Sequence, residues 1–348
     1  MKKKKIIYIL LFIILLFAMV ISALLFHILK PENKGTVVKG DIKPIPTVKI
    51  VDENSDSRPF AIMINNHNYA RPNHAGLQDA FVVYEVIVEG GITRLMAIFK
   101  DATTERIGSI RSSRHNFLDY ALEYDAIYVH FGWSKLAKSD ISKFKVNNIN
   151  GLYDNGFWRD KSLNVPSEHT AFTNIEKMTS TAKKRGYRLT TNEELPLHYR
   201  AYPLNINTED STKADEVIIP YSNYMTTSYK YDENTKLYLR YANKKEHTDA
   251  ITKKQYTAKN IIIMKVKNYS VDSYGRQNLD TAGTGEGYYI TNGYARKITW
   301  EKKTRTSKTI YKYLDGTEIT LNDGNTFIQV QPIEKKTSII TNETSDSQ

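Results

Sequence analysis

The pattern of apolar and polar positions divides the chain into a short apolar leader and a long mixed remainder. Residues 2–5 are lysines, and the run 6–26 that follows carries no charge and is almost wholly apolar. As a helix, this run would span about 30 Å at ~1.5 Å per residue, which is the thickness of a bilayer core. The pattern predicts one transmembrane helix within residues 1–30, with the lysines in the cytoplasm and the rest of the chain outside the cell. A cleaved signal peptide is the alternative, although its apolar core is usually only about 7–15 residues long.

The residues from 49 to 190 mix strand-like and helix-like patterns. Apolar runs at 81–88 and 93–99 are separated by Gly90-Gly91, which is typical of a hairpin. Further segments have apolar residues at helical spacing. We therefore expect a mixed α/β N-terminal domain, whose other elements are a strand at 60–64 and helices at 115–122, 134–144 and 174–185.

The residues from 215 to 332 show successive strands separated by turn signals. Two dipeptides that favour tight hairpin turns, Asp315-Gly316 and Asn292-Gly293, each stand between two strand-like runs. The pattern predicts a mostly antiparallel β domain, so the expected fold class is α+β, behind the N-terminal transmembrane helix. The other segments are predicted to be connections, namely a spacer at 31–48, a linker at 191–214 and a disordered tail at 333–348.

Composition and charge narrow the choice of partners. The net charge is +11, and because residues 1–30 hold five lysines and no acid, the remainder carries 11 − 5 = +6. This mild excess indicates either a solvated basic surface or attraction to anionic polymers. A basic run interleaved with aromatics is missing from the sequence, which argues against nucleic acid as a partner. The chain has no cysteine, which excludes disulfides, thiolate zinc sites, cysteine nucleophiles and a lipid-modified cysteine, and which hints at a Gram-positive source.

Motifs in both halves of the chain resemble those of one known family. The first half carries Arg71-Pro-x-x-x-Gly76-Leu, Tyr84-Glu-Val-Ile-Val-Glu-Gly-Gly-Ile-Thr-Arg94, Ile107-Gly-Ser-Ile-Arg-Ser-Ser-Arg114, Leu118-Asp-Tyr-Ala-Leu-Glu-Tyr-Asp125 and Val129-His-x-Gly132. The second half carries Tyr238-x-Arg240, His247-x-Asp249, Gly275-Arg276, Gly283-x-Gly285-x-Gly287 and Gly324-Asn-Thr-Phe327. These motifs, spread over 58–332, resemble the DUF3048 family and its companion C-terminal domain. The resemblance implies a two-part architecture and an envelope location, but no reaction. The chain departs from the lipoprotein type of the family, because an apolar segment stands in place of the lipidated cysteine.

Acidic residues in a strand-like run are the first candidates for catalysis. Glu85 and Glu89 are four residues apart, which places them on one strand face about 13 Å apart at ~3.3 Å per residue. This separation exceeds the ~5–10 Å between paired glycosidase carboxylates. A buried carboxyl with a raised pKa could still act as a general acid, assisted by His130 or Asp125. The simpler interpretation is a solvated strand face or an ion pair with a nearby arginine.

Two histidines stand close to predicted loops. His130 ends a strand-like stretch, where Asp119 or Asp125 could orient it for acid–base chemistry, or where it is simply a hydrogen-bonded structural residue. His247 and Asp249 lie two residues apart between strands, where they could line a ligand groove or simply close a turn.

Three arginines are candidates for ligand binding. Arg94, Arg111 and Arg114 lie in or near turns that follow apolar strands. Guanidinium groups bind carboxylate or phosphate bidentately, so these residues could hold the carboxylates of peptidoglycan or the phosphates of teichoic acid. The alternative is that they neutralise acids within the fold.

Two functional hypotheses follow from these features. The first is an enzyme that cleaves or remodels peptidoglycan, with Glu85 or Glu89 as the acid. The second is a non-catalytic module that binds a wall polymer or a membrane-associated envelope protein. The sequence shows no nucleotide, flavin or haem motif, so no cofactor is expected. His67 and His74 lack the spacing of a zinc motif, so no metal is expected either.

Overall fold

The structure is a computed structural model that describes residues 14–22 and 47–342. The first of these ranges forms a helix. Within the described residues, no helix is both long and apolar enough to cross a membrane. The described residues leave out the rest of the predicted anchor at 6–26. They also leave out the predicted spacer at 31–48, except for its last two residues.

The second of the two compact units of the chain, Pro46–Gln348, is built on an eleven-stranded sheet. The strand order is β10-β20-β19-β16-β23-β2-β3-β1-β5-β6, and β21 pairs with β20. The bounds of these strands are β1 Phe60–Asn65, β2 Val82–Ile87, β3 Thr93–Phe99, β5 Ile127–His130, β6 Asn148–Asn150, β10 Ser211–Lys213, β16 Asn260–Val266, β19 Gly283–Thr291, β20 Tyr294–Lys302, β21 Ile310–Tyr313 and β23 Thr326–Pro332.

The predicted elements of the N-terminal segment are confirmed. Strands β2 and β3 form an antiparallel hairpin across Gly90 and Gly91, both of which have positive φ. Two of the helices begin at side-chain caps, since Ser134 accepts a hydrogen bond from the amide of Ala137 and Asn174 accepts one from Lys177. The helices are α2 His115–Ala121, α3 Lys135–Lys143 and α4 Ile175–Lys184, with short 3-10 helices η1 Arg71–Asn73, η2 Leu77–Asp79, η3 Glu89–Gly91, η4 Leu122–Tyr124 and η5 Ser167–His169.

The C-terminal segment is mostly β, as predicted. Strands β19 and β20 form a hairpin whose turn residues Asn292 and Gly293 both have positive φ, which a tight hairpin turn requires. The hairpin across Asp315-Gly316 is also present, since the amide of Tyr313 donates to the carbonyl of Thr317. A second sheet runs β14-β13-β12-β11-β24, with β15 beside β13, and its strands are β11 Glu216–Pro220, β12 Thr226–Asp232, β13 Leu237–Ala242, β14 Lys245–Glu246, β15 Thr257–Ala258 and β24 Ser338–Ile340.

Strand β24 lies in the segment that was expected to be a disordered tail. It pairs antiparallel with β11, and Ile339 faces Val217 in the register. Residues 343–348 lie outside the described part of the chain. Three small sheets complete the fold, formed by β4 Ile107–Gly108, β8 Ala171–Thr173 and β7 Trp158–Arg159, by β17 Asn268–Ser270 and β18 Gln277–Leu279, and by β9 Tyr199–Arg200 and β22 Leu321–Asn322.

The two halves of the sequence share one sheet. Strand β23, from the C-terminal half, pairs in parallel with β2 on one side and with β16 on the other. The hydrogen bonds of the large sheet therefore continue from one half to the other. The N-terminal and C-terminal segments consequently form one compact unit rather than two separately packed bodies.

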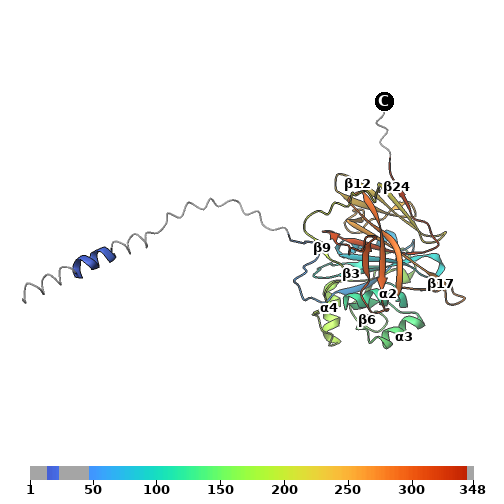
Figure 1. The fold of residues 1–348 in the computed structure, drawn as a ribbon. Coiled ribbons are helices and arrows are strands. Elements are labelled where there is room, and N and C mark those ends of the chain that lie inside the picture. Colours follow the sequence, from blue (N-terminus) through green and yellow to red (C-terminus); the bar gives the residue numbers. More distant parts are fainter. Residues whose placement is uncertain (1–13, 23–46, 343–348) are drawn as a thin grey trace, which may run out of the picture. The chain divides into compact units, whose positions relative to one another are not determined.

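The large sheet is covered on both faces. On one face, Tyr84 of β2 stacks on Tyr120 of α2 with ring centroids 4.7 Å apart. The next residue, Glu85, points the opposite way and meets Arg240 of β13 in the second sheet. Figure 1 shows the three helices on the side of the unit away from β12 and β24. Glu85 therefore lies in the layer between the two sheets.

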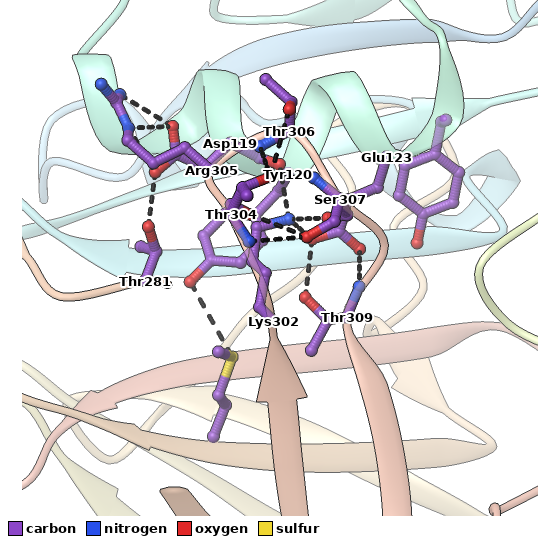
Figure 2. A network of polar contacts seen from close by, with 12 residues as sticks. Asp119, Tyr120, Glu123, Thr281, Lys302, Thr304, Arg305, Thr306, Ser307 and Thr309 are labelled. Atoms are coloured by element: carbon purple, nitrogen blue, oxygen red, sulfur yellow. Dashed lines mark hydrogen bonds and ion pairs between the residues drawn. The ribbon is translucent and has the colours of Figure 1, made fainter. Parts of the chain in front are cut away.

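A buried polar network joins α2 and η4 to the end of β20 and to the residues that follow it (Figure 2). Lys302 donates to Glu123 over 2.6 Å, and both side chains are fully buried. Glu123 also accepts from the hydroxyl of Thr309 over 2.7 Å. Asp119 accepts from Arg305 over 2.9 Å. These contacts connect residues more than 150 positions apart and so hold the two halves together.

Candidate functional site

The polar residues of the candidate site gather at one edge of the large sheet. Strand β5 pairs in parallel with β1 and with β6, and β3 pairs antiparallel with both β1 and β2. The carboxyl ends of β1, β2, β5 and β6 therefore lie at the same edge. Sheets of this kind usually bind their ligands there, because the loops after the strands converge.

Four of the sequence candidates form one cluster at this edge. Glu89, just after β2, accepts a hydrogen bond from Arg94 Nη2 over 2.7 Å. Arg114 Nε donates to the other carboxylate oxygen of Glu89 over 2.8 Å, and Arg114 Nη2 donates to Oε1. Arg94 also donates to the carbonyl of Ser112. The residues Glu89, Arg94, Arg111 and Arg114 are called the arginine cluster below.

Arg111 is bonded differently from the other two arginines of the cluster. Its Nη1 donates to the backbone carbonyl of Glu168 over 3.1 Å, and within the described residues it makes no ion pair. Burial lowers its pKa, and the charge of Arg114 lowers it further, whereas Glu168 and Glu89 raise it. The four residues of the cluster thus hold three guanidinium groups and one carboxylate, and the charge of Glu168 acts on Arg111 from outside the cluster.

The carboxylate of the cluster is held in its ionised form. Burial alone would raise the pKa of Glu89, but the hydrogen bond from Arg114 and the charges of Arg94 and Arg114 lower it to about 2. Glu89 is therefore a carboxylate at neutral pH, which suits an ion pair and does not suit a general acid.

Aromatic side chains also gather after the strands that end at this edge. After β1, the rings of His67 and His169 stack with their centroids 4.9 Å apart. The ring centroid of Tyr69 lies 5.8 Å from that of His169, and Tyr69 is 53% exposed. Trp133 follows β5 and Tyr153 follows β6, and their ring centroids lie 5.9 Å apart. Tyr153 is 70% exposed. Exposed rings at the same edge as the guanidinium of Arg111, which makes no ion pair within the described residues, are typical of a surface that binds polar ligands with flat faces, sugars included.

A hairpin from the C-terminal half also reaches this edge. The β17–β18 hairpin is held to α2 because Asn116 donates to the carbonyl of Gln277 over 2.9 Å and His115 bonds Asn278 over 2.9 Å. At its turn, Gly275 packs close to the backbone of Gly90, and Tyr274 is 66% exposed. The edge is therefore built from both halves of the sequence.

The structure does not bring Glu85 to this edge. Glu85 is fully buried between the two sheets, where Arg240 Nη2 donates to it over 2.7 Å. Thr93 and Thr227 donate to it over 2.7 and 2.9 Å. The ion pair that the sequence allowed therefore exists, but its arginine is Arg240 of β13 rather than a neighbour in sequence.

His130 and Asp125 lie at opposite ends of β5. The ring of His130 is buried, with Nδ1 bonded to the carbonyl of Gly132 over 2.7 Å and Nε2 close to Asn148 at 3.1 Å. Burial lowers the pKa of His130 to about 4. Asp125 precedes β5 and binds Arg58 and Arg188. Neither Asp125 nor Asp119, which binds Arg305, orients the histidine.

His247 and Asp249 connect the two halves of the sequence. The ring of His247 accepts from Arg240 at Nδ1 and bonds His74 over 2.8 Å at Nε2. Asp249 closes its own turn by accepting from the amide of Ile251 over 2.8 Å, and it also accepts from the amide of Gly76 over 2.8 Å. Within the described part of the chain, no group of three metal-ligating side chains is present.

Sequence reasoning missed several members of this edge. His67 was considered only as a metal ligand, while His169, Tyr69, Trp133 and the β17–β18 hairpin were not singled out. The signal for the hairpin was its motif Gly275-Arg276, because a positive-φ glycine next to an arginine marks a turn that presents a charge. The other rings carry no local signal, since the parallel pairing of distant strands brings them together.

The comparisons with known proteins agree with the resemblance seen in the sequence. Residues 47–188 match the model described as "Protein of unknown function (DUF3048) N-terminal domain", and residues 217–328 match the model of its C-terminal domain. The chain is 30% identical over 297 residues to "Putative lipoprotein YerB" of Bacillus subtilis (strain 168), covering 83% of this chain and 86% of the relative.

A solved structure has the same fold. The crystal structure of the YerB protein from Bacillus subtilis aligns with a TM-score of 0.72 at 29% identity, over 82% of this chain and 94% of the YerB chain. The relative is named a lipoprotein, which indicates association with the cell envelope. Since both domain models match in the expected order and the relative aligns along most of its length, the chain belongs to the DUF3048 family.

Proposed function

We propose that the chain is an envelope protein that binds the anionic groups of a cell-wall polymer at the arginine cluster. The observation that carries this proposal is that the arginine cluster holds three guanidinium groups and one carboxylate, with Arg111 in no ion pair within the described residues. A carboxylate or phosphate bound there would complete a charge-assisted pair, which contributes about 1.5–3 kcal/mol. The exposed rings beside it would pack against the sugar faces of the same polymer.

The proposed location follows from the N-terminal sequence. The apolar run 6–26 behind four lysines would hold the chain in the membrane as a single-pass anchor, with Pro46–Gln348 outside. This anchor would take the place of the lipidated cysteine, because the chain has no cysteine. The envelope association of the relative supports this arrangement.

The arrangement of the candidate catalytic residues favours binding over bond cleavage. Glu85 is fully buried between two sheets, and Arg94 and Arg114 keep Glu89 in its ionised form. His130 is buried with both ring nitrogens next to polar atoms. An acid–base pair for glycan cleavage needs two groups on either side of one bond, and these residues lie apart. The peptidoglycan-cleaving enzyme is therefore the second hypothesis.

Incubation of purified sacculi with the full-length chain in detergent separates the two hypotheses. We expect the chain to sediment with sacculi and to release no soluble muropeptides. The Arg111→Gln variant should sediment at least about tenfold more weakly, because it loses about 1.4 kcal/mol or more of pairing energy. Arg200→Gln, which removes the same charge from an exposed position in β9, is the matched control and should sediment normally. Release of muropeptides that disappears in Glu89→Gln would instead establish the enzyme.

A further inference from the structure

A second excess of positive charge lies near the layer between the two sheets. Arg240 and Glu85 form a fully buried ion pair, and Arg71 in η1 lies close enough for the charge of Arg240 to act on it. Burial lowers the pKa of Arg71, the charge of Arg240 lowers it further, and Glu85 raises it. Two guanidinium groups therefore share the field of one carboxylate.

Glu85 has no hydrogen-bonding capacity to spare for Arg71. Its Oε1 accepts from Asn66, Thr93 and Thr227, and its Oε2 accepts from Thr227 and from Arg240. Arg71 Nη1 donates instead to the carbonyl of Asn66 over 2.7 Å. Within the described residues Arg71 has no ion pair, so its half-buried charge is offset only by the field of Glu85, which Arg240 shares.

Arg71 lines a cleft of about 360 Å³ between the two halves of the sequence. One wall is the turn that holds Asn68 and Pro72, and the other is the β13–β14 hairpin with Lys245, His247 and Thr248. The volume lies in the range of small-ligand sites, about 300–1,000 Å³.

The charge of this cleft comes mainly from Arg71. His247 is neutral, because burial lowers its pKa well below the ordinary value and the charge of Arg240 adds to the effect. Its two ring nitrogens are already bonded to Arg240 and to His74. Lys245 and Glu246 are both exposed at the rim and offset each other. Arg71 thus lines a cleft in which the other charges offset each other. Within the described residues its guanidinium donates only from Nη1, to the carbonyl of Asn66 and to Met225 Sδ over 3.8 Å, so Nε and Nη2 remain available as donors.

We propose that this cleft is an anion-binding site in which the guanidinium of Arg71 receives a carboxylate or phosphate group. The site is separate from the arginine cluster, because no residue of that cluster lines it. It does not depend on the proposed function. Both halves of the sequence contribute a wall, so a bound anion also bridges the 68–72 turn and the β13–β14 hairpin.

Urea unfolding of the full-length chain tests this site with inorganic phosphate and with acetate as separate probes. Sodium chloride at matched ionic strength corrects for general salt effects. At a probe concentration ten times its Kd, the folding equilibrium constant rises about elevenfold. The Arg71→Gln variant should lose this gain whatever its own baseline stability, Arg71→Lys should retain part of it, and Arg111→Gln should keep the contribution of this cleft.

The two probes also identify the group that binds. A gain that is lost in Arg71→Gln and appears with phosphate alone assigns a phosphate ligand to this cleft, and such a gain with acetate assigns a carboxylate. The proposal is overturned if the native chain and Arg71→Gln respond equally to both anions, or if neither anion changes the folding equilibrium beyond the chloride control.

Discussion

At the scale of single residues, the buried pair of Glu85 and Arg240 carries the strongest prediction about stability. Both side chains are fully buried. Replacing Arg240 with Met leaves the carboxylate without its cation, and we expect a loss of about 3–5 kcal/mol in the free energy of unfolding, measured with urea. The Glu85→Gln/Arg240→Met double variant should recover part of this loss, because no charge then remains buried. A loss below about 1 kcal/mol in the single variant would contradict the account of this pair.

The glycines of β19 give a second prediction at the residue scale. A Cβ added at Gly287 would lie 1.8 Å from the backbone carbonyl oxygen of Ile263, so the neighbouring strand would have to move. We expect Gly287→Ala to destabilise the chain by about 2–3 kcal/mol, which thermal or urea unfolding would measure. Glu286→Ala on the same strand is exposed and is the matched control. If both variants were equally stable, the backbone around Gly287 would be able to move without a measurable loss of stability, which would contradict this prediction.

The arginine cluster shows what residue patterns predicted and what they left open. The three arginines Arg94, Arg111 and Arg114 were predicted either to bind anions or to neutralise acids within the fold. In the structure, two of them, Arg94 and Arg114, form ion pairs with Glu89. The partner of Glu85 could not be predicted, because Arg240 lies 155 positions away and meets it only through the packing of two sheets.

At the scale of elements, turn residues in the sequence predicted correctly which strands pair when a short turn joins the two strands. Gly90-Gly91 and Asn292-Gly293 each join neighbouring strands, so the hairpins followed from the turn residues. The parallel pairing of β23 with β2 could not be predicted, because no local signal selects a partner more than 200 residues away. The sequence predicted an N-terminal and a C-terminal domain, and β23 joins these two segments in one sheet.

The β17–β18 hairpin gives the prediction at the scale of elements. It is held to α2 by His115, which bonds Asn278, and by Asn116, which donates to the carbonyl of Gln277 and accepts from the amide of Leu279. Asn116→Ala should release the hairpin, increase amide hydrogen exchange at residues 268–279 and weaken binding to sacculi, while β19 and β20 remain protected. Unchanged exchange in the hairpin would show that other contacts position it.

At the scale of the whole molecule, three buried histidines should make the fold sensitive to acid. Burial lowers the pKa of His74 to about 3, of His130 to about 4, and of His247 well below the ordinary value. Their folded pKa values lie below the unfolded value of about 6.5, so the unfolded chain binds more protons as the pH falls below 6.5. Stability is therefore complete above that pH and decreases towards pH 4.

The size of this effect can be measured by urea unfolding at pH 7.5 and pH 5.5. Each histidine that stays neutral in the fold costs about 1.4 kcal/mol at pH 5.5, so the three together should lower the free energy of unfolding by about 4 kcal/mol. The carboxylates with lowered pKa values, such as Glu89 at about 2, do not contribute in this range. His74→Gln should reduce the difference between the two pH values, and a stability that does not change with pH would contradict the buried neutral state.

The central claim is that the arginine cluster binds anionic groups of a wall polymer, and an affinity measurement tests it most directly. The affinity of the full-length chain for purified sacculi would be measured for the native chain, for the Arg111→Gln/Arg114→Gln double variant and for Arg200→Gln. We predict that the double variant binds at least about a hundredfold more weakly, that Arg200→Gln binds like the native chain, and that added salt weakens native binding. Equal affinity of all three chains, independent of salt, would contradict the account.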